Sequence, residues 1–374
     1  MDETYRTPEF FAWEIETQQR DKEVVYAEDL FVEKEECGNK ATQAFKTPEA
    51  IFKINYDHHQ VKKRKQVDIP KQTKRSWFFL DKIKSFLKVK SIFSCIDAAE
   101  SNNEFAEVDY VEDIYQCYKL TENSTIAKPG YMEETQKEID AKMRARLVDW
   151  LIEVHTEFKY TTETLYLTIQ IVDRYLSTNS VSQWLLTLVG ISALRIASKY
   201  EENQVMIRGI SIDDYVCISK YYYSRKEIIA MEKLILQKLE WRLTVPTPYV
   251  FLVSYIKAAA AVSDMEKMED MAFFLAELGL IHYELILRYS PSMLAASSVF
   301  AARCTLKIIP FWNKTLEQHT GFSVSQILDC AKLLVHFHSM AVENNLRGVC
   351  TKYSCTAHGA VALLPPAETL LASF

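Results

Sequence analysis

Residues 143–176 constrain the fold more than any other stretch, because helical periodicity and charge occur together in them. In the first part, apolar side chains recur at steps of three and four residues, which lines one face of a helix. The segment 161–163 (TTE) breaks this pattern. A second run, 165–176, is too densely apolar for a helix on the surface. The stretch therefore predicts an amphipathic helix followed by a buried one.

Two charged residues, Arg144 and Asp173, fall inside these runs. Buried charges are rare unless they are paired. The pattern alone leaves two interpretations open for each residue, a solvent-facing position or a buried pair.

Composition limits the class of protein. The chain has 374 residues, of which 48% are hydrophobic and 25% charged, as expected for a soluble globular protein with room for two domains. A net charge of −6 argues against nucleic acid as the main partner. Eight cysteines without a CxxC pair indicate reduced thiols inside a cell. The longest uncharged run, 175–194, is too polar to span a bilayer, so we expect no membrane association.

The first 95 residues differ from the rest. Charges are dense there and no sustained helical period appears, which predicts a largely disordered N-terminal arm over 1–95. The arm contains a basic cluster at Lys62, Lys63, Arg64 and Lys65. Such a cluster is either solvated charge or a nuclear import signal. On the second interpretation, the protein resides in both nucleus and cytoplasm.

From Ile96 onward, helical segments follow one another without a convincing alternating strand, which predicts an all-α body. Two segments, 188–199 and 293–304, are crowded with small residues. Small side chains allow close approach from several sides, as the central helix of a bundle requires. Two prolines in the segment 244–249 separate them. We therefore expect two helical bundles in tandem, over 96–243 and 244–374.

No set of residues indicates catalysis. The chain contains no phosphate-binding loop, nucleophile elbow or zinc-protease motif. His336 and His338 are two residues apart and would point in different directions on a helix, which makes a poor metal site. We expect no catalytic residue, no metal, no cofactor and no small-molecule substrate.

A resemblance to a known family rests on many short segments in one order. They are MRARLVDWL (143–151), SALRIASKYEE (192–202), DYVCIS (214–219), MEKLILQKLEW (231–241), VPTPYVFL (245–252), FLAELGLIHYE (274–284), PSMLAASSVFAARCTL (291–306), HTGFS (319–323), KYS (352–354) and VALLPP (361–366). Together they resemble the cyclins, and in particular the plant B-type mitotic cyclins, from about residue 96 to 366. The resemblance implies two tandem five-helix cyclin folds. It also implies a regulatory subunit, not an enzyme, that forms a heterodimer with a cyclin-dependent protein kinase and activates it at the G2/M transition.

The resemblance also implies roles for single residues. In cyclins, a lysine that ends the central helix of the first box and a glutamate of its last helix contact the kinase; the matching residues are Lys199 and Glu232. Their apolar neighbours match Tyr200, Leu236 and Trp241. Arg144 and Asp173 match a buried structural ion pair.

A second family surface docks Arg-x-Leu peptides of substrates and inhibitors. Its matching residues are Met143, Leu147, Trp150 and Glu153. Here Arg146 stands where the family usually has isoleucine. A cation removes apolar contact and repels the arginine of such a peptide, so we expect docking here to be weak or absent.

Two further departures from the family leave alternatives open. The segment 203–213 is longer than usual and lacks the usual proline, and it follows Lys199 closely. No RxxL or KEN degradation motif occurs before residue 100, so the timing of degradation is open. A divergent adaptor that binds a kinase without activating it is therefore an alternative function. A cyclin-fold protein that binds nucleic acid is a more distant one.

Overall fold

The computed structural model describes residues 111–202, 209–259, 265–341 and 344–371. Every regular element in these ranges is a helix, and they contain no strand, which confirms the predicted all-α body. The predicted arm over 1–95, its basic cluster at Lys62–Lys65 and the segment 203–208 lie outside the described residues.

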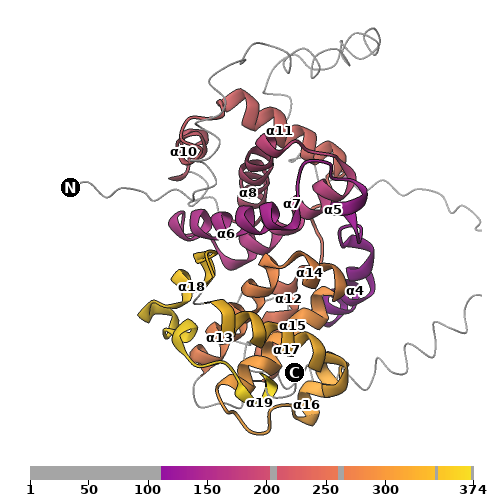
Figure 1. Cartoon of the computed structure of the whole chain (residues 1–374). Coiled ribbons are helices and arrows are strands. Elements are labelled where there is room, and N and C mark those ends of the chain that lie inside the picture. The colour runs from indigo at the N-terminus through magenta and orange to yellow at the C-terminus, as the bar shows by residue number, and fades with distance from the viewer. Residues whose placement is uncertain (1–110, 203–208, 260–264, 342–343, 372–374) are drawn as a thin grey trace, which may run out of the picture. The chain divides into compact units, whose positions relative to one another are not determined.

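The N-terminal bundle has the small-residue helix α8 at its centre (Figure 1). Helices α6, α7 and α11 all pack against α8. Close approach depends on Gly190 of α8, because a Cβ there would lie 2.7 Å from Leu147 Cδ1. The five bundle helices are α6 (Ala141–Glu157), α7 (Thr162–Thr178), α8 (Leu186–Glu201), α10 (Ile212–Ile218) and α11 (Arg225–Lys238). Three further elements of this part of the chain are α4 (Val111–Thr125), α5 (Tyr131–Glu134) and η3 (Gln183–Leu185).

The C-terminal bundle repeats this plan around α15, the second small-residue helix, against which α12, α13 and α17 pack. The prediction of two tandem five-helix bundles is thus confirmed. The five helices are α12 (Pro248–Ala258), α13 (Met265–Ile281), α15 (Pro291–Thr305), α16 (Lys314–Thr320) and α17 (Val324–Ala341). The remaining elements are α14 (Tyr283–Arg288), α18 (Gly348–Tyr353), η4 (Thr356–His358), η5 (Val361–Leu363) and α19 (Glu368–Leu371).

Local sequence explains where the main helices begin. Asp140 caps α6 by accepting a hydrogen bond from the Met143 N–H at 2.7 Å. At the start of α11, Ser224 and Glu227 form a reciprocal capping box. Prolines open α12 and α15, where the missing N–H has no helical partner to lose.

Arg144 joins the two bundles. Its side chain is fully buried, and its Nε and Nη2 atoms donate to the two carboxylate oxygens of Asp173 at 2.6 and 2.8 Å. Its Nη1 atom donates to the carbonyls of Leu280 and Ile281, at the end of α13, both at 3.0 Å. Although burial lowers the pKa of Arg144, the Asp173 carboxylate raises it above its ordinary value overall. One residue thus holds α6, α7 and α13 together.

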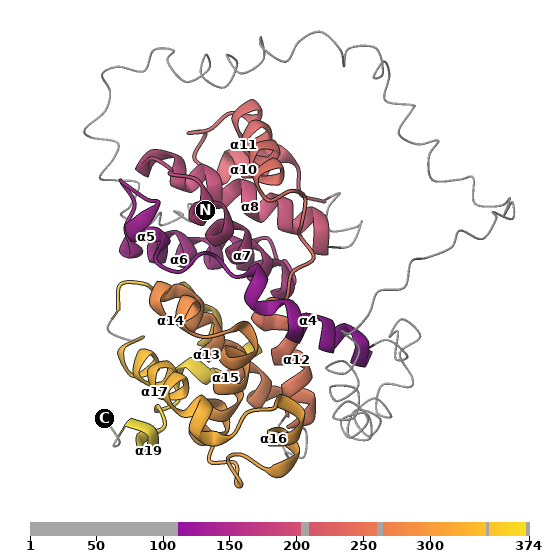
Figure 2. The same cartoon turned by 90° about the vertical axis from the view of Figure 1, so that its right-hand side faces the viewer.

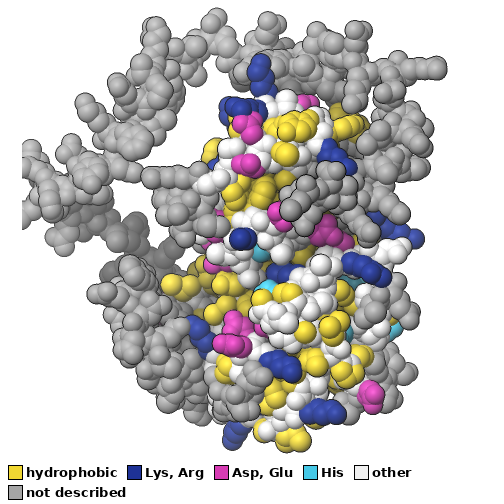
Figure 3. Space-filling model, turned by 90° about the vertical axis from the view of Figure 1, so that its left-hand side faces the viewer, with side chains coloured by type: hydrophobic (Ala, Val, Ile, Leu, Met, Phe, Trp, Pro, Cys, Tyr) yellow, Lys and Arg dark blue, Asp and Glu magenta, His cyan; other side chains and the backbone are white. Residues whose placement is uncertain are grey.

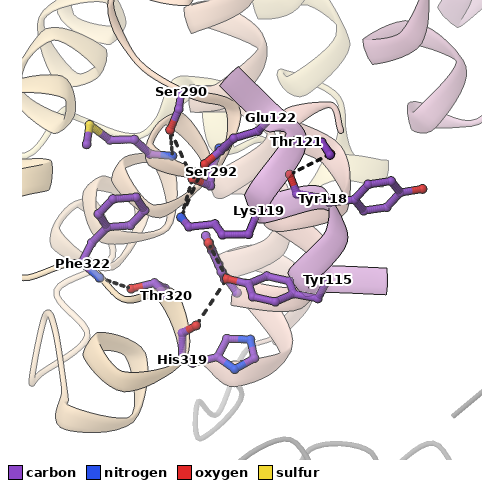
Figure 4. Close-up of polar contacts among 12 residues, drawn as sticks. Tyr115, Tyr118, Lys119, Thr121, Glu122, Ser290, Ser292, His319, Thr320 and Phe322 are labelled. Carbon is purple, nitrogen blue, oxygen red and sulfur yellow. Dashed lines mark hydrogen bonds and ion pairs between the residues drawn. The ribbon is translucent and has the colours of Figure 1, made fainter. Parts of the chain in front are cut away.

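Helix α4 precedes the first bundle in sequence but is anchored on the second (Figures 2 and 4). Glu122 is 3% exposed and accepts hydrogen bonds from the Ser292 N–H at 2.9 Å and the Ser292 hydroxyl at 2.8 Å. Lys119 donates to the same hydroxyl at 2.6 Å, and its Nζ lies 4.0 Å from the centre of the Phe322 ring. The helix therefore ties the start of the described chain to the C-terminal bundle.

A second polar junction lies where α18 meets both bundles. Asp149 of α6 accepts the N–H groups of Gly348 and Arg347 at 2.8 and 3.1 Å. A Cβ at Gly348 would lie 2.6 Å from the Asp149 carbonyl oxygen, so only glycine fits there. The fully buried Glu277 of α13 pairs with Lys352 at 2.6 Å. The last part of the described chain is thereby fastened to α6 and α13.

The Arg144 contacts predict a large loss of stability on removal of the guanidinium. Arg144→Met leaves Asp173 charged and buried with only a tyrosine hydroxyl donor. We expect the free energy of unfolding, measured by urea denaturation, to fall by about 3–5 kcal/mol. Adding Asp173→Leu should recover part of this loss. The exposed Lys142→Met is the control, with a change within about 0.5 kcal/mol. A loss below about 1 kcal/mol for Arg144→Met would contradict this account.

Candidate partner-binding site

A buried carboxylate between two cations defines the candidate site on α8 and α11. Glu232 is 4% exposed, and its Oε1 lies 2.7 Å from Lys199 Nζ, an ion pair. Arg195 pairs with the other carboxylate oxygen. The Lys199 side chain is 42% exposed, so part of its ammonium group faces outward. The structure therefore brings together the two residues that the resemblance singled out.

Sequence reasoning missed Arg195. It lies four residues before Lys199 on α8, which places both cations on one face of the helix. This four-residue spacing is the sequence signal from which Arg195 could have been identified. Arg195 also lies over the Tyr215 ring at 5.9 Å, which connects the site to α10.

Exposed aromatic side chains lie near the C-terminal ends of α8 and α11, the two helices that carry the pair. Tyr200 and Trp241 are 47% and 67% exposed, whereas Leu236 is half-buried. The Tyr200 hydroxyl hydrogen-bonds to the Thr244 hydroxyl, which joins the end of α8 to the segment after α11. Glu240 and Trp241 have φ values of 53° and 60°, a left-handed turn that costs about 1–2 kcal/mol for each L-residue. The chain thus holds the exposed Trp241 in a backbone conformation that is costly for a residue other than glycine.

The predicted peptide-docking patch presents little apolar surface here. Met143, Leu147 and Trp150 are only 6%, 4% and 7% exposed. Arg146 and Glu153 of the same helix are exposed. Desolvation, with Asp149 as a second cause, raises the pKa of Glu153. A peptide approaching this face would therefore meet charges first.

The segment 203–213, which is longer than in the family and lacks the usual proline, belongs to the described residues only from 209 onward. From Gly209 onward the chain is defined, and α10 begins with a capping box between Ser211 and Asp214. The end of α8 at Glu202 is also regular. Helical structure is therefore intact on both sides of residues 203–208.

Four histidines of the described ranges are largely buried. Burial lowers the pKa values of His155, His282, His319 and His338 to about 4, so these rings are neutral near pH 7. In the described ranges, no group of three or more His, Cys, Asp or Glu side chains is arranged to hold a metal ion. The same ranges include no helix long and apolar enough to cross a membrane.

The structure has two tandem five-helix bundles that a buried arginine joins, and the first bundle carries the Lys199–Glu232 ion pair. This arrangement is a duplicated cyclin fold. The family profile for the cyclin N-terminal domain matches residues 113–244, and that for the cyclin C-terminal domain matches residues 246–367. The chain belongs to the cyclin family, a class of regulatory proteins and not of enzymes. The resemblance seen in the sequence is thereby confirmed.

Plant mitotic cyclins are among the proteins whose sequences are similar to this chain. The chain is 53% identical over 270 residues to G2/mitotic-specific cyclin-2 of Antirrhinum majus, covering 72% of this chain and 59% of that protein. It is 45% identical over 342 residues to Cyclin-B1-3 of Arabidopsis thaliana, covering 91% and 78%. The chain spans 58–59% of the length of several curated relatives that it matches.

Among solved structures, a viral cyclin from herpesvirus saimiri has the same fold. The TM-score is 0.52 at 20% identity, over 61% of this chain and 97% of the viral chain.

Arg146 and the buried patch lead to a binding prediction. An Arg-x-Leu peptide should bind the full chain far more weakly than the ordinary micromolar affinity, because Arg146 repels its arginine. Arg146→Ile should strengthen binding, while the exposed Lys142→Ile should not. Competition binding with a labelled peptide measures both. Ordinary micromolar affinity for the unaltered chain would refute the prediction.

Proposed function

We propose that this chain is a regulatory subunit that binds a cyclin-dependent protein kinase as a heterodimer and activates it at the G2/M transition. The observation that carries the proposal is the Lys199–Glu232 pair, with the exposed Tyr200 following Lys199 on α8 and the exposed Trp241 following α11. The similarity to plant G2/mitotic cyclins supports it. An aromatic surface around hydrogen-bonded charges has the composition of an interaction hot spot.

The arrangement suggests how binding would favour one kinase conformation. Arg195 and Lys199 fix the Glu232 carboxylate, so it is oriented before a partner arrives. An ammonium group has three donors, and the Lys199 side chain is 42% exposed, so it can donate to backbone carbonyls of the kinase. A kinase is active when its αC helix and activation loop are correctly placed. A partner that binds only this arrangement raises its population, and about 5 kcal/mol of preference moves it from mostly inactive to mostly active.

Kinase activation tests the proposal. A purified mitotic cyclin-dependent kinase should phosphorylate a histone-type substrate at least tenfold faster with the full chain than without it. The Lys199→Ala, Glu232→Ala double variant should lose this activation, since truncating a hot-spot residue costs about 2 kcal/mol or more. Lys199→Ala alone keeps the Glu232–Arg195 pair and so separates binding from folding. The matched control is Arg225→Ala, which removes an exposed charge from α11, the helix that carries Glu232. This variant should activate the kinase normally.

A pull-down separates the alternatives. Kinase binding without activation would favour the adaptor, and no binding of the kinase would reject the proposal for that kinase. Nucleic-acid binding has less support: on the face in Figure 3, basic side chains lie in separate places among acidic and hydrophobic ones. Steep salt-dependent DNA binding by the chain would favour it instead.

We also propose that the protein resides in nucleus and cytoplasm, with import directed by the basic cluster at Lys62–Lys65. A fluorescent fusion in which these four residues are alanine should be depleted from the nucleus relative to the unaltered fusion. Equal nuclear signal for both fusions would reject the cluster as an import signal.

A further inference from the structure

A polar groove lies where the ends of three helices meet. It is lined by Ser124, Thr125 and Ile126 at the end of α4, by Arg174, Ser177 and Thr178 of α7, and by the segment 238–245 that connects α11 to α12. Its volume is about 560 Å³. Figure 2 shows the connecting segment descending beside α7 and α4. We call this feature the connector groove.

The connector groove carries an excess of positive charge. Its lining includes three cations, Arg174, Lys238 and Arg242, and one acid, Glu240. Glu240 lies beside Arg242, with Oε2 2.9 Å from Nη2, and both side chains are well exposed. An exposed pair of this kind is weak and gives way readily to a stronger partner.

Cations are common at helix C-termini, where they complement the carbonyl groups. Arg174 does not act in this way, because its Nη1 donates at 2.7 Å to the carbonyl of Arg242, which lies in the connecting segment and outside any helix. This one bond leaves most of its five donors unused, and within the described part of the chain no carboxylate forms an ion pair with Arg174. Burial and the neighbouring Arg242 both lower the pKa of Arg174. Helix capping therefore does not explain Arg174, a half-buried cation that has no acid of its own and feels the charge of a second arginine.

We propose that the connector groove binds a phosphomonoester, the phosphorylated serine or threonine side chain of a protein partner. A dianion between Arg174 and Arg242 would accept charge-assisted hydrogen bonds from both, and the planar guanidinium fits phosphate oxygens in pairs. It would also remove the repulsion between the two arginines. The exposed Trp241 at the rim offers apolar contact to the residues beside the phosphate.

A protein source fits better than nucleic acid. The groove is one compact site on a chain of net charge −6, whereas nucleic-acid binding requires a basic track along several phosphates. The inference is independent of kinase binding, because its test uses the full chain alone.

The first experiment measures binding of O-phosphothreonine to the full chain by calorimetry, with threonine as the unphosphorylated control. We expect saturable binding of phosphothreonine only. Arg174→Gln should weaken it at least tenfold and Arg242→Gln several-fold. Arg242→Gln keeps the carbonyl that Arg174 contacts, so it remains informative even if Arg174→Gln folds poorly. Arg225→Gln, at the opposite end of α11 from the groove lining, removes an exposed arginine and should bind like the unaltered protein.

Three results would overturn the proposal. One is no phosphothreonine binding at millimolar concentration. Another is binding that survives both Arg174→Gln and Arg242→Gln, which would place the anion elsewhere. The third is displacement of phosphothreonine by a short single-stranded oligonucleotide at a much lower phosphate concentration, which would assign the groove to nucleic acid.

Discussion

The buried ion pair between Arg144 and Asp173 is the interaction on which the rest of the structure depends. The Arg144 guanidinium pairs with Asp173 of the first bundle and donates to two carbonyls at the end of α13 in the second, so one charge joins the two bundles. Its burial is tolerated because every face of the group finds an acceptor, including a carboxylate that Tyr131 also contacts. Aliphatic residues of the same volume could fill the space but would leave the Leu280 and Ile281 carbonyls without this donor.

This junction leaves the surface of the first bundle free to carry the candidate site. Glu232 and its two cations lie on α8 and α11, away from the carbonyls that Arg144 contacts, and α8 is supported from beneath by α6 through the close approach at Gly190. The connector groove occupies the next position along the chain, where α11 passes into α12.

Much of this followed from residue patterns. The period of 143–158 and the small residues of 188–199 and 293–304 predicted helices that the structure contains, because these signals are local. The resemblance named Lys199 and Glu232, and the structure places them 2.7 Å apart. Arg195 was missed because an arginine on a helix has the same appearance whether it faces water or a buried acid. The depth at which Met143, Leu147 and Trp150 are buried was not predictable either, since an apolar helix face does not reveal how completely its neighbours cover it.

By itself, the sequence determined the helical class, the tandem arrangement and the family, because periodicity, proline positions and ordered motifs are properties of short segments. Only the tertiary structure decided which interpretation of Arg144 and Asp173 holds, that Arg195 shares Glu232 with Lys199, and that Arg174 and Arg242 line one groove. Each of these depends on the packing of segments far apart in the chain. The energy of a charge is set by the atoms that surround it, and those atoms are assembled only when the bundles form.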